Sequence, residues 1–249
     1  MGTIAFAGGD PAHFPTRGRQ TEGVGQINLP AGGLPYYLTG TYGWCYVDPR
    51  NCRLLDREAI VSAILWGQHR KLQQMALAEI SPGQKVLLPA AVYGEFPASL
   101  ARHVGATGAL VVSDINPVQI EICRPKISAL PWTSLRRADA RRPPGGPFDA
   151  VCCYFLLHEL PEDYKQAVVD GLLAALAPGG KAIFVDYHKP HWAHPAGPVM
   201  SAVFDRLEPY AKSLWRHPIR DFASRRAEFD WRTETCFGGL YQRTVASGR

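Results

Sequence analysis

The pattern of hydrophobic and polar positions predicts alternating strands and helices from about residue 85 onward. Four short segments are almost continuously apolar, as expected for strands buried on both faces of a parallel sheet: KVLLPAAV, ALVVSDI, FDAVCCYFLL and KAIFVDYH. A shorter strand is predicted in SLRRADA. The intervening segments have helical spacing, as in PEDYKQAVVDGLLAALAPGG, where we expect Gly179-Gly180 to end the helix. This alternation indicates an α/β fold with helices on both faces of the sheet.

The two ends of the chain depart from this alternation. Residues 1–33 are rich in Gly, Pro, Thr and Gln and predict a flexible leader, while residues 34–80 predict an N-terminal helical cap that includes a helix or kinked pair over 57–80. The segment TETCFGGLYQRTVA predicts two strands around Gly238-Gly239. Five α/β units and a terminal antiparallel hairpin are typical of class I methyltransferases. We therefore expect residues 81–249 to form a Rossmann-like, mostly parallel seven-stranded sheet that binds S-adenosylmethionine.

Composition narrows the class of protein only modestly. Of the 249 residues, 46% are hydrophobic, which is enough for a sizeable core. The net charge of +5 is too mild to indicate nucleic acid; it suits an anionic membrane surface or an ordinary basic protein in solution. The six cysteines form no CxxC pair and are expected to be reduced and buried. No signal peptide and no membrane-spanning run is recognisable, so we expect a cytoplasmic protein. The oligomeric state is not readable.

Ligands of open α/β sheets bind beyond the carboxyl ends of the strands. Asp114 ends the second strand, where a carboxylate accepts hydrogen bonds from ribose hydroxyls, although a helix cap is the other explanation. Asp139 ends the third strand and is expected near the adenine or in a solvated loop. The cofactor site is therefore predicted at the strand ends, from Ala91, Tyr93, Gly94, Glu95, Asp114, Ile115, Asp139, Ala140 and Tyr154.

The first turn of the sheet, in VLLPAAVYGEF, holds one glycine where dinucleotide-binding turns hold two or three. Those glycines allow the backbone to approach a diphosphate, which S-adenosylmethionine lacks. Its sulfonium and amino acid end need space, acceptors and an aromatic face, which Tyr93 and Glu95 could supply. The turn therefore argues against a dinucleotide and permits S-adenosylmethionine, while a pseudoenzyme would also be free to lose its glycines.

Histidines and carboxylates are concentrated after the fourth and fifth strands, in YFLLHELPED and VDYHKPHWAH. Such mixed donors suit Mn²⁺, Fe²⁺ or Zn²⁺, so we predict a metal bound by Asp186, His188 and His158. The alternative is a set of hydrogen-bonded histidines that orient a substrate without metal. The candidate general bases are His158, Glu159 and His188. Aromatic and imidazole side chains that could bind a flat ring are Tyr42, Tyr46, Trp66 and His191, although aromatic core packing explains each aromatic residue as well.

Eight segments, spread in order from Leu34 to Val245, give a more specific indication. They are TYGWCYVDP, AILWGQHRKL, AAVYGE, DINPVQ, FLLHE, VDYHKPH, LEPYAKSLWRH and CFGGLYQ, and together they resemble the RquA family of rhodoquinone biosynthesis proteins. The segment around Pro89, Ala90 and Ala91 departs from the family pattern, and a proline inside a central strand predicts a bulge or an early strand end.

The resemblance implies that the protein converts ubiquinone to rhodoquinone by replacing a ring methoxy group with an amino group. S-adenosylmethionine would be the amino donor, with a divalent metal, Mn²⁺ favoured, and the protein would contact the inner face of the cytoplasmic membrane peripherally. The helical region 57–80 is the candidate docking face, through Arg57, His69, Arg70 and Lys71. Two alternatives stay open: an S-adenosylmethionine-dependent methyltransferase acting on a quinone or another small aromatic, and a non-catalytic protein that binds a quinone or a partner enzyme.

Overall fold

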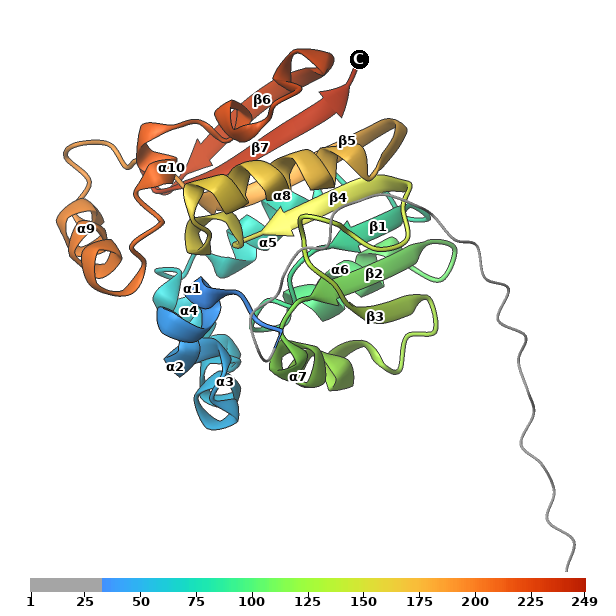
Figure 1. Ribbon diagram of the computed structural model, residues 1–249, viewed down its shortest axis with the longest axis horizontal. Coiled ribbons are helices and arrows are strands. Elements are labelled where there is room, and N and C mark those ends of the chain that lie inside the picture. The colour runs from blue at the N-terminus through green and yellow to red at the C-terminus, as the bar shows by residue number, and fades with distance from the viewer. Residues whose placement is uncertain (1–32) are drawn as a thin grey trace, which may run out of the picture.

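A computed structural model describes residues 33–249, and the predicted leader lies outside these residues except for Gly33. The chain forms one seven-stranded sheet with strand order β3-β2-β1-β4-β5-β7-β6 (Figure 1). Its strands are β1 (Lys85–Leu88), β2 (Ala109–Asp114), β3 (Thr133–Arg137), β4 (Phe148–Tyr154), β5 (Leu176–Tyr187), β6 (Phe229–Cys236) and β7 (Tyr241–Gly248). The first five are parallel, and β7 and β6 are antiparallel to their neighbours. The predicted Rossmann-like methyltransferase fold is confirmed.

Helices cover both faces of the sheet because successive strand residues point to opposite sides. In β1, Val86 and Leu88 face the cluster that also holds residues of α5 (His69–Leu77), α6 (Phe96–Val104) and α7 (Pro117–Ile127). Leu87 faces the other cluster, with α8 (Glu162–Ala174). The continuous apolar runs of the sequence correspond to strands that are buried on both faces.

The cap consists of four short helices, α1 (Tyr36–Gly40), α2 (Gly43–Tyr46), α3 (Pro49–Leu55) and α4 (Glu58–Ile64), grouped at one end of the sheet (Figure 1). The predicted kinked pair is confirmed as α4 and α5. The break lies at Trp66 and Gly67, with positive φ values of 51° and 73°, a backbone conformation that ends a right-handed helix. The division of the chain into a cap and an α/β domain at residue 80 stays a prediction.

Beyond β5 the chain forms α9 (Ala196–Leu207) and α10 (Ser213–Arg216) before the final hairpin. Three short 3₁₀ turns complete the described structure: η1 (Leu157–Glu159), η2 (Ile219–Phe222) and η3 (Arg226–Glu228). The hairpin turn runs through Phe237, Gly238 and Gly239, all with positive φ, as the glycine pair predicts.

One predicted boundary is wrong. The helix α8 ends at Ala174 rather than at Gly179-Gly180, because the following residues already pair with the sheet. Phe148 donates its amide hydrogen to Ala175 O at 2.9 Å, and an irregularity between Phe148 and Ala150 accommodates the extra residues of β5. Within residues 33–249, no helix is long and apolar enough to cross a membrane.

Candidate functional site

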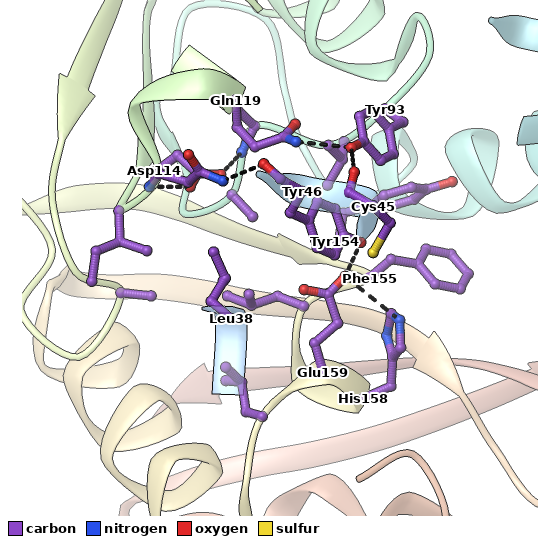
Figure 2. A pocket seen from close by; sticks show the side chains of 18 of the residues that line it. Leu38, Cys45, Tyr46, Tyr93, Asp114, Gln119, Tyr154, Phe155, His158 and Glu159 are labelled. Carbon is purple, nitrogen blue, oxygen red and sulfur yellow. Dashed lines mark hydrogen bonds and ion pairs between the residues drawn. The ribbon is translucent and has the colours of Figure 1, made fainter. Parts of the chain in front are cut away.

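A pocket lies between the cap and the carboxyl ends of the parallel strands (Figure 2). Most residues predicted to bind the cofactor line it: Ala91, Tyr93, Asp114, Ile115, Asp139, Ala140 and Tyr154. Further lining residues were not singled out from the sequence: Tyr37, Leu38, Cys45, Asn116, Gln119, Phe155, Tyr187 and Glu208. The topology therefore brings the strand ends together as expected, and the roles assigned to these residues stay predictions.

Asp114 is fixed at one end of the pocket by backbone amides. Strand β1 ends at Leu88, one residue before Pro89, which has no amide hydrogen for a strand partner. The chain then turns so that Ala91 N donates to Asp114 Oδ2 at 2.9 Å, while Asn116 N donates to Oδ1 at 2.8 Å. Burial raises the pKa of Asp114 to about 6, although these amide hydrogen bonds oppose the increase. The carboxylate is positioned to accept hydroxyl groups of a ligand.

The N-terminus of α6 is closed by carboxylates of the cap. Gly94 N donates to Asp56 Oδ1 at 3.0 Å, and Glu95 N donates to Glu58 Oε2 at 3.2 Å. Lys126 forms an ion pair with Asp56 and donates to Gly94 O at 2.9 Å. Gly94 and Glu95, both predicted to bind the cofactor, therefore lie outside the pocket lining, because cap side chains already occupy their amides.

An aromatic wall separates the two ends of the pocket. The rings of Tyr46 and Tyr93 stack with centroids 5.5 Å apart and an interplanar angle of 11°. Gln119 Nε2 donates to the Tyr93 hydroxyl at 2.9 Å, and Asn116 Nδ2 donates to Tyr46 O at 2.6 Å. The Tyr93 hydroxyl in turn donates to Cys45 O. The sequence DINPVQ thus contributes Asp114, the last residue of β2, and also the side-chain amides of Asn116 and Gln119, which hold the tyrosine wall in place.

Asp139 lies on the pocket but is already paired. Its two carboxylate oxygens accept from the Arg141 guanidinium at 2.6–3.1 Å, and that guanidinium lies 4.2 Å from the centre of the Tyr164 ring. Neighbouring Ala140 and Ile115 supply apolar lining on the same side. The site predicted for adenine is therefore bounded by an ion pair and two apolar side chains.

His158 and Asp186 form a buried pair at the other end of the pocket. His158 Nδ1 donates to Asp186 Oδ1 at 2.9 Å, and Tyr187 N donates to the same oxygen at 2.7 Å. Asp186 Oδ2 accepts from Leu157 N at 2.9 Å and His158 N at 3.3 Å. Burial lowers the pKa of His158, but the charge and hydrogen bond of Asp186, with Glu208 and Glu159 nearby, outweigh it and raise this pKa to about 9. The raised pKa favours the protonated imidazole, with Nε2 left for a ligand.

Two further carboxyl groups surround this imidazole. Glu159 Oε1 lies 3.8 Å from His158 Nε2 and accepts a hydrogen bond from the Tyr46 hydroxyl (Figure 2). Burial raises the pKa of Glu159 to about 8; His158 opposes this increase and Glu208 adds to it. Glu208, which follows α9, also lines the pocket. This end can therefore exchange protons and can hold positive charge.

The predicted metal site is not assembled. Within residues 33–249, no group of three His, Cys, Asp or Glu side chains is placed to hold a metal ion. The four donors around Asp186 occupy its oxygens, so a metal could bind there only by displacing one of them. His188 lies on the hairpin instead: its N donates to Leu240 O at 2.7 Å, and its Nδ1 lies 2.9 Å from Gly239 O. It is also absent from the pocket lining, and its catalytic role stays a prediction.

The four residues predicted to bind the substrate ring separate in the structure. Tyr46 lines the pocket. Tyr42 is fully buried behind it, Trp66 points its indole Nε1 at Met200 Sδ at 3.3 Å, and His191 lies on the loop after β5, where its amide donates to Gly238 O. Of the four predicted docking residues, His69 is buried and paired with Glu58 at 3.1 Å, so it is not part of a surface.

Comparison with known proteins agrees with this geometry. Residues 86–180 match the family model of a methyltransferase domain. The chain is 27% identical over 177 residues to the ubiquinone/menaquinone biosynthesis C-methyltransferase UbiE of Shewanella pealeana, covering 63% of this chain and 70% of that protein. It is 30% identical over 131 residues to UbiE of Pseudomonas putida F1, covering half of each chain.

Solved structures show the same fold at low sequence identity. The N-methyltransferase NodS from Bradyrhizobium japonicum WM9, in complex with S-adenosylhomocysteine, superposes with a TM-score of 0.57 at 15% identity, over 86% of this chain and 99% of NodS. An S-adenosylmethionine-dependent methyltransferase from Aquifex aeolicus gives 0.54 at 16% identity, over 81% of this chain and 99% of that one. The structural comparisons show the fold, and the sequence match to the methyltransferase domain model covers residues 86–180.

Proposed function

We propose that this chain, a class I S-adenosylmethionine-dependent methyltransferase by its domain and fold and a distant homologue of the UbiE enzymes, acts on the ring of a quinone. In its finer form, the proposal is that the protein transfers the amino group of S-adenosylmethionine to ubiquinone in place of a methoxy group, forming rhodoquinone. The observation that carries the proposal is the single pocket that joins Asp114 to the buried His158–Asp186 pair across the stacked tyrosines.

The two ends of the pocket suit the two reactants. Asp114 would accept the ribose hydroxyls of S-adenosylmethionine, and the apolar residues Ile115 and Ala140 would border the adenine. The flat face of Tyr46 can stack against a quinone ring. The charged His158, through Nε2, would donate a hydrogen bond to a quinone oxygen and draw electrons from the ring.

Amino transfer also needs a base. The donor nitrogen must lose a proton before it adds to the ring carbon that carries the methoxy group, and methoxide must then leave as methanol. Glu159, beside His158 Nε2 and with a raised pKa, is suited to accept the proton from nitrogen and return one to methoxide. The bond between that nitrogen and the cofactor's α-carbon would then break after a base removes the α-proton and the electron pair passes into the quinone ring: water hydrolyses the resulting imine, releasing the cofactor as its 2-oxo acid and the ring as the aminohydroquinone.

Amino transfer is supported by the resemblance to the RquA family, whose motifs FLLHE and LEPYAKSLWRH contain His158, Glu159 and Glu208. That resemblance also implies Mn²⁺. Because the predicted ligands do not come together, no step here is assigned to a metal.

Methyl transfer to a quinone ring is the second candidate, and the sequence comparisons favour it, since the matched UbiE proteins are named C-methyltransferases. It would use the same pocket, with Glu159 removing a proton from the acceptor. A non-catalytic quinone-binding protein would need no buried base, and the three buried ionisable groups argue against that alternative.

Isotope labelling tests the proposal. The purified protein is incubated with ubiquinone and S-adenosylmethionine carrying either a nitrogen label in the amino group or a carbon label in the methyl group, with and without Mn²⁺. We expect the nitrogen label in a quinone product that has lost one methoxy group. Methyl label in the product would establish the second candidate, and unlabelled quinone under all conditions would contradict both.

The mouth of the pocket supports the proposed peripheral contact with a membrane. Trp44 and Ile64 both line the pocket and are 51% and 48% exposed, and the neighbouring Trp66 is 41% exposed. The basic residues Arg70 and Lys71 follow Trp66 at the start of α5 and are exposed. Exposed tryptophans beside basic side chains suit the interface of an anionic bilayer, from which a lipid-soluble quinone would enter.

A further inference from the structure

Glu208 is a partly buried carboxylate that the predicted reaction did not include. It lies directly after α9 and lines the pocket. Within residues 33–249, its Oε2 is buried without a hydrogen bond of standard geometry, and the Tyr42 hydroxyl is the side-chain donor that helps to lower the pKa of this carboxyl. A buried carboxylate oxygen without a well-formed hydrogen bond is costly, because it has lost its water and gained little in return. Such a group indicates that a ligand supplies a further donor.

A second buried polar group adjoins the same carboxylate. Tyr42 is fully buried behind the pocket lining, and its hydroxyl interacts with the Glu208 carboxyl. Burial first, and then the neighbouring Glu208 and Glu159, raise the pKa of Tyr42, so its hydroxyl stays neutral beside the two acids. A ligand that reaches Glu208 would therefore meet the two acidic side chains that line the pocket there, Glu208 and Glu159.

The position of Glu208 is held by a buried lysine. The Lys165 ammonium, on α8, donates to Leu160 O and to Tyr210 O, the latter at 2.9 Å. Leu160 follows Glu159, and Tyr210 lies two residues after Glu208. This lysine therefore fixes the two acidic segments relative to each other, and both face the same pocket.

On the opposite side of the pocket, the Asp114 carboxylate accepts from backbone amides and the Asp139 carboxylate is paired with Arg141. The amides of Gly94 and Glu95, just before α6, donate to Asp56 and Glu58 of the cap. A carboxylate of a ligand would have to displace these side chains to bind there. The amino acid end of a cofactor whose ribose lies at Asp114 is thus directed away from α6.

We propose that Glu208 and Glu159 bind the α-ammonium group of S-adenosylmethionine, and that this pair, rather than the turn after β1, holds the amino acid end of the cofactor. The ammonium supplies a charged N–H donor to Glu208 Oε2 and to Glu159, whose Oε1 lies 3.8 Å from His158 Nε2. The inference rests on the cofactor assigned under the proposed function. It deepens that function, because it places the donor nitrogen where a ring stacked on Tyr46 would meet it.

Calorimetric binding of two non-reactive probes tests this assignment. S-adenosylhomocysteine carries the ammonium, whereas methylthioadenosine keeps the adenosine and sulfur but has no amino acid end. We expect Glu208→Gln and Glu159→Gln each to weaken S-adenosylhomocysteine binding by about 10- to 100-fold, the size of one charged hydrogen bond, and to change methylthioadenosine binding by less than about 3-fold. The control is Glu121→Gln, an exposed residue paired with Arg124 on α7, which should bind both probes as the wild type does.

Each other outcome has a defined meaning. Equal weakening of both probes would show that Glu208 only maintains the fold of the pocket, and unchanged S-adenosylhomocysteine binding in both variants would also overturn the assignment. Loss of a Mn²⁺-dependent thermal shift in Glu208→Gln, with S-adenosylhomocysteine binding intact, would make the acids metal ligands instead. If the wild-type protein binds neither probe, the proposed function fails rather than this inference.

Discussion

The two ends of the pocket are built in opposite ways. At the adenosine end, Asp114 is held by the amides of Ala91 and Asn116, which belong to the strand ends of the fold itself. At the other end, His158, Glu159 and Glu208 come from a 3₁₀ turn and from the segment after α9, and side chains hold them in place. The backbone end would serve any transferase of this fold, whereas the side-chain end must determine what is transferred.

The largest expected effect of a single substitution comes from removing His158, which tests whether the side-chain end carries the reaction. We expect His158→Ala to lower the rate of quinone modification by about 100- to 10,000-fold, because it removes a proton donor or acceptor at the reacting ring. Binding of S-adenosylhomocysteine should change far less. The rate is measured by mass spectrometry of the quinone product.

His188→Ala is the matched control, since that ring lies on the hairpin and not in the pocket. It should keep a rate within about 3-fold of the wild type, the range expected of a residue outside the site. An equal loss in both variants would mean that the His188 ring reaches the site in solution, as a metal site of Asp186, His188 and His158 requires.

Lys165, which holds the side-chain end of the pocket, should make the free energy of unfolding depend on pH. Burial lowers its pKa from 10.5 to about 8, although Asp186 and Glu162 oppose the decrease. Since the folded pKa is below the unfolded one, the charged lysine destabilises the fold fully below pH 8, and this cost disappears as pH rises to 10.5. This lysine alone should raise the free energy of unfolding by about 3 kcal/mol between those limits. The free energy of unfolding is measured with denaturant at several pH values. For Lys165→Met it should not rise between pH 8 and 10.5 as it does for the wild type. The same pH dependence in both proteins would contradict the prediction.

Asp114 tests the adenosine end. Replacing it by Asn keeps the shape but weakens acceptance of ribose hydroxyls and of the Ala91 and Asn116 amides, so we expect about a 10-fold loss of affinity. Unlike the Glu208 variant, this one should lose S-adenosylhomocysteine and methylthioadenosine binding equally, as measured by calorimetry. A loss confined to S-adenosylhomocysteine would mean that the ribose lies elsewhere.

The backbone end is also the end that the sequence predicts well. Apolar strands alternating with helices determine the order of the parallel strands, and the strand ends then place Asp114, Asp139 and Tyr154 at one edge. Even the early end of β1 follows from Pro89, which cannot donate an amide hydrogen.

The other end depends on interactions that no spacing reveals. Asp186 and His188 are two residues apart at the end of β5, yet hydrogen bonds to η1 hold the first and the turn before β7 holds the second. Glu208 was missed because the apolar pattern ends with α9, and its return to the pocket depends on Lys165 holding Tyr210. The LEPYAKSLWRH motif was the available signal for it.

The smallest expected effect concerns the exposed residues Trp44, Ile64 and Trp66 at the mouth of the pocket. If Trp44 and Trp66 contact a bilayer, changing both to Ser should reduce binding to vesicles of phosphatidylglycerol and phosphatidylcholine by about 10-fold, because two aromatic side chains leave the interface. The control is Tyr36→Ser: this residue is also exposed, but it does not line the pocket, and its ring packs near Tyr164 of α8. Co-sedimentation measures the effect, and pure phosphatidylcholine vesicles should bind the wild type less, because Arg70 and Lys71 then lose their partners. Equal binding by all three proteins would place membrane contact, and with it the entry of the quinone, on another face.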